Sequence, residues 1–97
     1  MIVAKKQEIV IGWITYVIDE DKMKYLTIAI DSETEEKGVS DALLQKCVEI
    51  AERYNLTEIS TTIRLDNLFS QGLFRRNGFQ LIRGITGYEA KLYNSFY

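Results

Sequence analysis

The stretch NLFSQGLFRRNGF, residues 67–79, decides how this chain folds. Asn67 is a good helix cap, because its side chain can accept a hydrogen bond from a free backbone N–H of the first turn. Gly78 stands at a position where helices commonly end in left-handed backbone, which glycine adopts without steric cost. The stretch therefore predicts a helix from Leu68 to about Asn77.

A longer amphipathic helix is predicted before this one. Apolar residues recur at steps of three and four from Val39 to Tyr54, with charged residues between them. Asn55 fits the end of this helix, because asparagine tolerates the left-handed conformation. The pattern predicts about four helical turns.

Extended segments surround the two helices. Residues 9–18 are almost wholly β-branched or aromatic, and residues 25–30 and 58–63 alternate along their length. Shorter strands are expected at residues 2–4, 79–82 and 88–93. The predicted order is β-β-β-α-β-α-β-β, an α+β fold that begins with a meander of two or three antiparallel strands.

Length and composition restrict the protein class. The 97 residues predict one domain, residues 1–97, and the 46% hydrophobic and 27% charged fractions are those of a globular protein. There is no histidine and only one cysteine, Cys47. This excludes an internal disulfide and a histidine-based catalytic triad, and we predict no metal site.

Charge and hydropathy indicate where the protein works. The net charge is −2 with both signs interspersed, which gives no clear footprint for nucleic acid. The pair Arg75 and Arg76 is a local exception, although such a doublet is more often a solvated helix face than a binding patch. No apolar run is long enough for a membrane span and no export signal is evident, so we expect a cytoplasmic protein without a membrane partner.

The stretch TEEKGVSDALL, residues 34–44, raises the question of a phosphate site. A strand that ends near Asp31, followed by a helix from Val39, would leave unpaired backbone N–H groups at the helix terminus, and such a terminus attracts anions. Gly38 would allow close approach of a diphosphate, and Lys37 adds a positive charge.

Two glutamates in this stretch argue against a phosphate site. A carboxylate about 4 Å from a phosphate charge costs roughly 1 kcal/mol in water, so Glu35 and Glu36 would have to point outward. Acidic residues also stabilise the first turn of a helix by themselves. Taken alone, the stretch is explained equally well by a helix start and by a phosphate site.

Residues 67–79 resemble the penultimate helix of the GCN5-related N-acetyltransferases (GNAT). That helix reads Asn, two residues, a small residue, two residues, an apolar residue, an aromatic residue, three residues, Gly and Phe. This chain matches it at Asn67, Ser70, Leu73, Phe74, Gly78 and Phe79. The resemblance extends from about Ile9 to the C-terminus and implies the acyl-CoA N-acyltransferase fold, a mixed and mostly antiparallel sheet with two main helices.

The resemblance also implies acetyl-CoA as acyl donor. Residues 35–40 fall where the family carries Gln/Arg-x-x-Gly-x-Gly/Ala, but only Gly38 matches strictly. In the family, this loop holds the diphosphate and the central strand pairs with the pantetheine arm, beside a splayed strand expected here at residues 58–63. The residues implied for the cofactor are Ile28, Ala29, Ile30, Glu35, Glu36, Lys37, Gly38, Val39, Ser40, Asn67, Phe74 and Arg76, with Arg75 as an alternative to Arg76.

Several of these residues have a structural interpretation as well. Asn67 could be a helix cap and no more, while Phe74 and Phe79 fit the hydrophobic core. Cys47 lies on the apolar side of its helix and is predicted to be a small buried hydrophobe rather than a nucleophile.

Catalysis is the weakest part of the resemblance. The family's frequent tyrosine acid falls on Phe74, which cannot donate a proton, although a thiol pKa near 8.5 makes CoA a tolerable leaving group. A glutamate base found in some members falls on Tyr25, a poor base near neutral pH. Tyr25 and Tyr88 are therefore only weak catalytic candidates, with Glu89 or water as alternatives.

The family normally begins with a strand and two helices that this chain lacks. Either it is a minimal member acting on a large acceptor, or a second copy completes it as a homodimer. Our leading hypothesis is an acetyltransferase acting on an amine, either a small molecule or a protein. The alternatives are a GNAT-like CoA-binding or protein-interaction module without catalysis, and an α+β protein without a cofactor.

Overall fold

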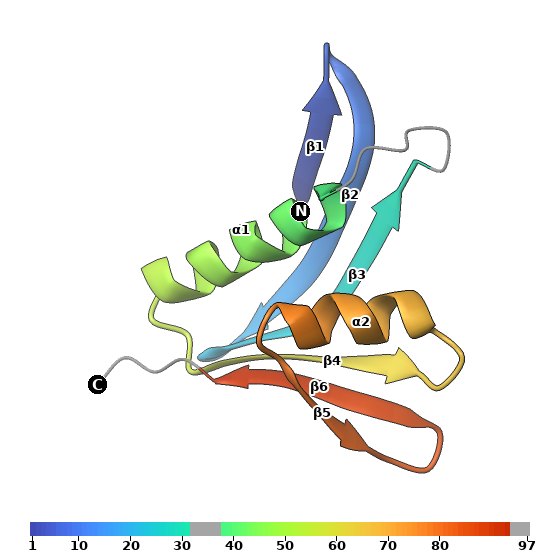
Figure 1. Ribbon diagram of the computed structural model, residues 1–97. Coiled ribbons are helices and arrows are strands. Elements are labelled where there is room, and N and C mark those ends of the chain that lie inside the picture. Colours follow the sequence, from blue (N-terminus) through green and yellow to red (C-terminus); the bar gives the residue numbers. More distant parts are fainter. Residues whose placement is uncertain (32–37, 94–97) are drawn as a thin grey trace.

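The computed structural model describes residues 1–31 and 38–93 and contains eight elements in this part of the chain. Their order, β-β-β-α-β-α-β-β, is the predicted one (Figure 1). The elements are β1 (Ile2–Lys6), β2 (Ile9–Asp19), β3 (Lys22–Ile30), α1 (Val39–Arg53), β4 (Glu58–Arg64), α2 (Leu68–Arg76), β5 (Gln80–Arg83) and β6 (Gly87–Tyr93).

The described strands form one six-stranded sheet in the order β1-β2-β3-β4-β6-β5. All neighbouring strands are antiparallel except β3 and β4, which run parallel. The prediction of an α+β fold with a mixed, mostly antiparallel sheet is confirmed.

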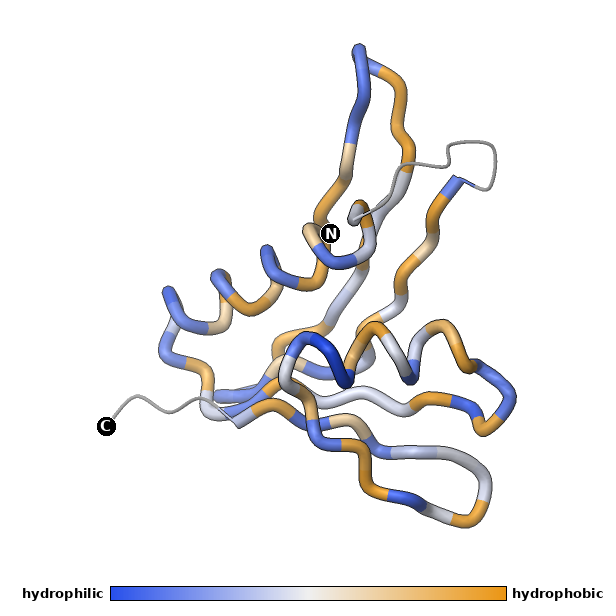
Figure 2. The backbone as a smooth tube through the Cα atoms, in the orientation of Figure 1, coloured by the Kyte–Doolittle hydropathy of each residue, from blue (hydrophilic) through white to orange (hydrophobic). Residues whose placement is uncertain are grey.

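Both helices lie on the same side of the sheet, which we call the helix face. Side chains from α1, α2 and the strands form one hydrophobic core there, which includes Ile14, Met23, Leu44, Leu73 and Phe74. Hydrophobic and hydrophilic residues alternate along α1, as expected for a helix that covers a sheet (Figure 2). The opposite side of the sheet is called the outer face.

The predicted helix ends are confirmed. The Asn67 side chain accepts a hydrogen bond of 3.0 Å from the Ser70 backbone N–H. Gly78 follows α2 with a φ of 90°, and Asn55 follows α1 with a φ of 55°. Within the described residues, neither helix has the length and apolar composition needed to cross a membrane.

The centre of the sheet has a short junction. The β3–β4 ladder contains only the pairs from Lys22–Glu58 to Lys24–Ser60, and beyond it the two strands diverge (Figure 1). The Thr61 hydroxyl donates to the Leu26 carbonyl at 3.2 Å just past the last pair. We call this place the parting point, and it leaves the rest of β3 paired only with β2.

The backbone of β3 is irregular at the parting point. Tyr25 has a φ of 58°, which is rare for a bulky residue. The register of β2 against β3 shifts between Thr15 and Val17, which marks a β-bulge at the same level. Bulges re-aim side chains and often lie beside functional sites.

Candidate functional site

A cleft of about 620 Å³ opens on the helix face beside the diverging part of β3. Its walls come from β3, the start of α1 and one side of α2. The lining residues are Ile28, Ile30, Gly38, Val39, Ser40, Asp41, Phe69 and Arg76. A cleft of this size is in the range of small-molecule sites.

The start of α1 supplies backbone donors to this cleft. Gly38 precedes the helix with a φ of 90°, and its carbonyl accepts from the Ala42 N–H at 2.9 Å. No side chain in the described part of the chain caps this helix start. The first-turn N–H groups and the positive end of the helix dipole are therefore available to an anion.

Asp41 and Arg76 join the two helices at the edge of the cleft. The Arg76 Nε and Nη2 atoms donate to the two carboxylate oxygens of Asp41 at 2.8 and 2.9 Å. This bond lowers the pKa of Asp41 against the opposing effect of partial burial, and Asn77 adds a third donor at 2.9 Å. Because a guanidinium carries five N–H donors, Arg76 retains three for other partners.

Six residues predicted for the cofactor lie together in the cleft: Ile28, Ile30, Gly38, Val39, Ser40 and Arg76. Ala29 is the Cα partner of Trp13 in the β2–β3 ladder and does not line the cleft. The predictions for Glu35, Glu36 and Lys37 lie outside the described residues. Neither Arg75 nor Asn67 lines the cleft.

Three other predicted residues have clear structural surroundings. Phe74 is 3% exposed and packs edge-to-face on Phe79, with 4.9 Å between the ring centroids. Cys47 is fully buried, as predicted, and its apolar surroundings raise the pKa of its thiol to about 12. A thiol in this environment is not a nucleophile near neutral pH.

The two tyrosine candidates lie at different places. Tyr25 is on β3 at the parting point and is well exposed. Tyr88 is on β6, where the guanidinium carbon atoms of Arg75 and Arg83 stand 5.6 and 5.7 Å from its ring centroid. Tyr88 therefore belongs to a surface cluster, while Tyr25 is beside the point where the strands diverge.

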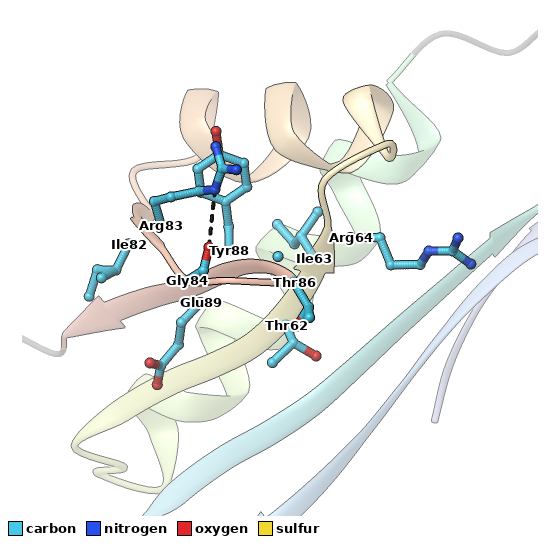
Figure 3. A pocket seen from close by; sticks show the side chains of 10 residues that line it. Thr62, Ile63, Arg64, Ile82, Arg83, Gly84, Thr86, Tyr88 and Glu89 are labelled. Carbon is cyan, nitrogen blue, oxygen red and sulfur yellow. Dashed lines mark hydrogen bonds between the residues drawn. The ribbon is translucent and has the colours of Figure 1, made fainter.

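A second hollow of about 220 Å³ lies at the parting point, and we call it the outer groove. Residues of three strands line it: Lys24, Tyr25, Ser60, Thr61, Thr62 and Glu89. It shares Thr62 and Glu89 with a further hollow of about 370 Å³ around the β5–β6 turn (Figure 3).

Sequence reasoning did not find Asp41 or Phe69 as cleft residues. Phe69 and Arg76 are seven positions apart, which places them on one side of a helix two turns apart. This spacing was a usable signal for Phe69. The signal for Asp41 is weaker, because its pairing with Arg76 depends on how the two helices pack.

The chain thus combines two parallel strands that diverge in the middle of an α+β sheet with a helix start and a cleft beside the point of divergence. The model of the acetyltransferase (GNAT) family matches residues 1–79. The chain belongs to this family.

A relative and three solved structures illustrate the likeness. The uncharacterized protein YxbD of Bacillus subtilis (strain 168) is 32% identical over 74 residues, which are 76% of this chain and 45% of that protein. The PaiA N-acetyltransferase of Thermoplasma acidophilum, in complex with coenzyme A, has a TM-score of 0.86 at 18% identity, over 95% of this chain and 58% of that chain.

Two further structures have the same fold. YncA of Salmonella typhimurium, with acetyl-CoA, gives a TM-score of 0.82 at 16% identity and covers 98% of this chain and 64% of that one. The ribosomal-protein-S18-alanine N-acetyltransferase of Escherichia coli gives 0.84 at 17%, with 96% and 67% covered. The present chain thus spans about half to two thirds of the length of these proteins.

Proposed function

We propose that this protein binds acetyl-CoA in the cleft and transfers the acetyl group to an amine. The observation that carries the proposal is the position of the cleft, which runs along β3 to the first turn of α1. Among the described residues, this part of β3 has no strand partner on the β4 side, and no side chain caps the start of α1. An extended pantetheine arm could pair with that strand edge, and the diphosphate would meet the helix N–H groups. Structural neighbours that hold coenzyme A or acetyl-CoA support this choice of ligand.

Each end of the ligand has a suitable surface. Ile28, Ile30 and Phe69 offer apolar contact to the arm, while Gly38 and Ser40 offer backbone donors to the diphosphate. Arg76 keeps donors free for phosphate oxygens although it is held by Asp41. In our proposal Asn67 and Phe74 act through the structure, as the cap of α2 and as part of the core under the cleft.

The reaction is a direct attack. The amine nitrogen attacks the thioester carbonyl carbon, the C–N bond forms, the C–S bond breaks, and CoA leaves as a thiolate. The proton lost from nitrogen goes to water. A lysine-like amine must first become neutral, which costs about 4 to 5 kcal/mol at neutral pH, whereas the thiolate leaves without help.

A catalytically inactive CoA-binding module is the second candidate. It is favoured by the burial of Phe74 at the family's tyrosine position, and by the tyrosine rather than glutamate at position 25. Among the described residues that line the cleft, Asp41 is the single carboxylic acid and there is no tyrosine. Asp41 is bound to Arg76 and is therefore not a free base. An amine with a lowered pKa would remove the need for a base.

A two-step experiment tests the proposal. Thermal unfolding is followed with and without acetyl-CoA, and stabilisation of about 2.7 kcal/mol is expected at 100 times its Kd. Arg76→Gln should weaken binding, while Arg53→Gln, at the far end of α1, should not. Absence of any shift at millimolar acetyl-CoA would contradict a CoA site.

The second step separates the enzyme from the module. The protein is incubated with acetyl-CoA and a panel of amines and proteins, and free thiol is measured. Thiol release above the background hydrolysis rate supports transfer. Binding without release would favour the module.

Two other sequence-based ideas stay predictions. They are the cytoplasmic location and the homodimer, whose contact the apolar C-terminal residues Tyr93, Phe96 and Tyr97 could serve. Of these, Tyr93 is 57% exposed, and Phe96 and Tyr97 lie outside the described residues. Sedimentation of the purified protein would decide the oligomeric state.

A further inference from the structure

We propose that Asn77 and Gln45 are positioning residues for the acetyl-CoA site. Through Asp41, they hold the Arg76 guanidinium so that its free donors meet a phosphate of the ligand. This inference rests on the proposed binding of acetyl-CoA and adds the residues that prepare one of its contacts. We call Asp41, Gln45, Arg76 and Asn77 the helix clamp, because together they join α1 to α2.

The centre of the helix clamp is the Asp41 carboxylate, which accepts three hydrogen bonds from the end of α2. Arg76 Nε and Asn77 Nδ2 donate to its Oδ1 atom at 2.8 and 2.9 Å, and Arg76 Nη2 donates to its Oδ2 atom at 2.9 Å. The Arg76 hydrogen bond lowers the pKa of Asp41 against partial burial, and the Asn77 hydrogen bond lowers it further. Asp41 is therefore ionised at neutral pH and can accept all three bonds.

The bond from Asn77 removes a freedom that Arg76 alone leaves to the carboxylate. A paired guanidinium and carboxylate lie in one plane, but the torsion that carries a carboxylate group has a broad energy minimum, so the pair can swing as a unit. Asn77 holds the Oδ1 atom from a second residue and restricts this swing. The direction of the remaining Arg76 donors therefore depends on Asn77.

Asn77 can hold the carboxylate because both ends of its own amide are occupied. Its Nδ2 atom also donates to the Leu73 carbonyl at 2.8 Å, and its Oδ1 atom accepts from Gln45 Nε2. Because an ionised carboxylate and a backbone carbonyl are acceptors only, they require the NH2 end of the amide and leave its oxygen to Gln45. Leu73 thus ties Asn77 to the backbone of α2, and Gln45 ties it to α1.

The four members divide into two that line the cleft and two that do not. Gln45 follows Asp41 by four positions, so both side chains lie on the same side of α1. In the described part of the chain, Asp41 and Arg76 line the cleft, whereas Gln45 and Asn77 do not. Gln45 and Asn77 therefore act on a ligand in the cleft only through the other two members.

A guanidinium that is ordered before binding favours the ligand. The Arg76 side chain is 52% exposed, and a long exposed side chain loses rotamer freedom when a ligand immobilises it. The helix clamp imposes this loss in advance, while two Nη1 hydrogens and one Nη2 hydrogen remain for phosphate oxygens. One immobilised side chain corresponds to a difference of about two- to tenfold in affinity.

Positioning by Asn77 has to be distinguished from a purely structural role, because its bond to the Leu73 carbonyl also caps α2. A cap stabilises the helix end whether or not Arg76 is present. Positioning, in contrast, loses its effect on affinity when Arg76 is removed. The coupling between these two residues is therefore the decisive quantity, and a double-mutant cycle measures it.

The cycle compares acetyl-CoA affinity, by calorimetric titration, in the wild type, Asn77→Leu, Arg76→Gln and the double variant. We expect Asn77→Leu alone to weaken binding about two- to tenfold, and to have no further effect in the Arg76→Gln background. An unchanged affinity in Asn77→Leu, or losses that multiply in the double variant, would overturn the proposal.

Two further variants separate the helix clamp from damage to the helix end. Gln45→Ala, on an exposed part of α1, removes only the bond to the Asn77 oxygen, and a loss of about twofold is expected, again absent in the Arg76→Gln background. Gly78→Ala disturbs the same end of α2 without removing a clamp bond and should leave the affinity unchanged. Equal losses in Gly78→Ala and Asn77→Leu would show that only the helix end matters.

A measurement without ligand separates this proposal from acetyl-CoA binding itself. The Arg76 Nε–H group donates to Asp41, and protection by such a bond slows proton exchange with water. In NMR spectra of the free protein, this exchange should be faster in Asn77→Leu than in the wild type and unchanged in Gly78→Ala. If acetyl-CoA fails to bind the wild type, the proposed function fails, and the exchange rate still decides whether Asn77 orders Arg76. Equal exchange in all three proteins would overturn the proposal whatever the ligand does.

Discussion

Asp41 and Arg76 show how single residues couple stability to the cleft. The side chains are 34% and 52% exposed, and the pair joins the first turn of α1 to the last turn of α2. Removing the carboxylate by Asp41→Asn should lower the free energy of unfolding by about 0.5 to 1 kcal/mol at pH 7, the range for an aligned but exposed pair.

The sign of the pH dependence follows from the lowered pKa of Asp41. Because the folded state holds the ionised form more strongly, the contribution is complete above about pH 5 and is lost as the pH falls below about 3.9 toward the folded-state value. Urea unfolding of both proteins between pH 7 and pH 3 measures this. A difference that stays constant down to pH 3 would contradict the ion pair as its source, and Glu49→Gln, in an exposed pair with Lys46, serves as control.

Cys47 gives a second residue-scale prediction. Burial raises the pKa of its thiol to about 12, so the thiolate is scarce and unreachable in the folded state. Alkylation by iodoacetamide at pH 8 should be about 100-fold or more slower in buffer than in denaturant, since it requires opening of the core. Comparable rates in the two conditions would show that α1 does not pack as described.

The element scale is illustrated by the two glycines at helix ends. Gly38 and Gly78 both have a φ of 90°, so Gly38→Ala and Gly78→Ala should each lower the free energy of unfolding by about 1 to 2 kcal/mol. A Cβ at Gly38 would meet no atom within 4 Å in the described part of the chain beyond its sequence neighbours.

Only one of these two substitutions should affect the ligand. Gly38→Ala is expected to weaken acetyl-CoA binding beyond its effect on folding, because Gly38 lines the cleft. Gly78→Ala, at the end of α2, is the matched control. Calorimetric titration of both variants decides this, and equal affinities would favour a purely structural Gly38.

Local signals explain why most elements could be predicted. The cap at Asn67, the stop at Gly78 and the left-handed Asn55 each depend on the residue itself and its immediate neighbours. The Asp41–Arg76 contact spans 35 positions and depends on the crossing of two helices, so no local pattern indicates it. The positive φ of Tyr25 is likewise imposed by the strand pairing around it, against the preference of tyrosine.

The residues of the candidate site could be predicted only where their spacing in the sequence indicated a common face or a helix start. Ile28 and Ile30 alternate on one face of a strand, and Gly38 to Ser40 follow from the expected helix start, so these residues were found. The outer groove depends on where β3 and β4 diverge, which is a property of the whole sheet. Glu89 therefore entered the sequence analysis only as a substitute base.

At the scale of the whole molecule, the sheet consists of two three-stranded parts. β1, β2 and β3 carry α1, and β4, β6 and β5 lie under α2, with only the short β3–β4 ladder joining the strands (Figure 1). Hydrogen exchange should be fast at the backbone amides of residues 26–30 that face β4, because they have no strand partner on that side.

Acetyl-CoA should change this exchange pattern selectively. Protection is expected to rise in residues 26–30 and in the first turn of α1, and to stay unchanged in β5 and the last turn of α1. Exchange followed by mass spectrometry with and without the ligand measures it. Uniform protection over the chain would indicate general stabilisation without the proposed contacts.

The short junction between the two parts also has a mechanical consequence. A sheet that is continuous across its middle resists bending there, whereas three residue pairs and one threonine hydroxyl form a compliant joint. A molecule bound between the two strands would stiffen this joint, because its polar groups would form hydrogen bonds with the backbone of β3. The stiffness of the domain would then depend on whether a ligand is bound in the cleft. Binding and release would change the relative motion of the two outer edges of the sheet.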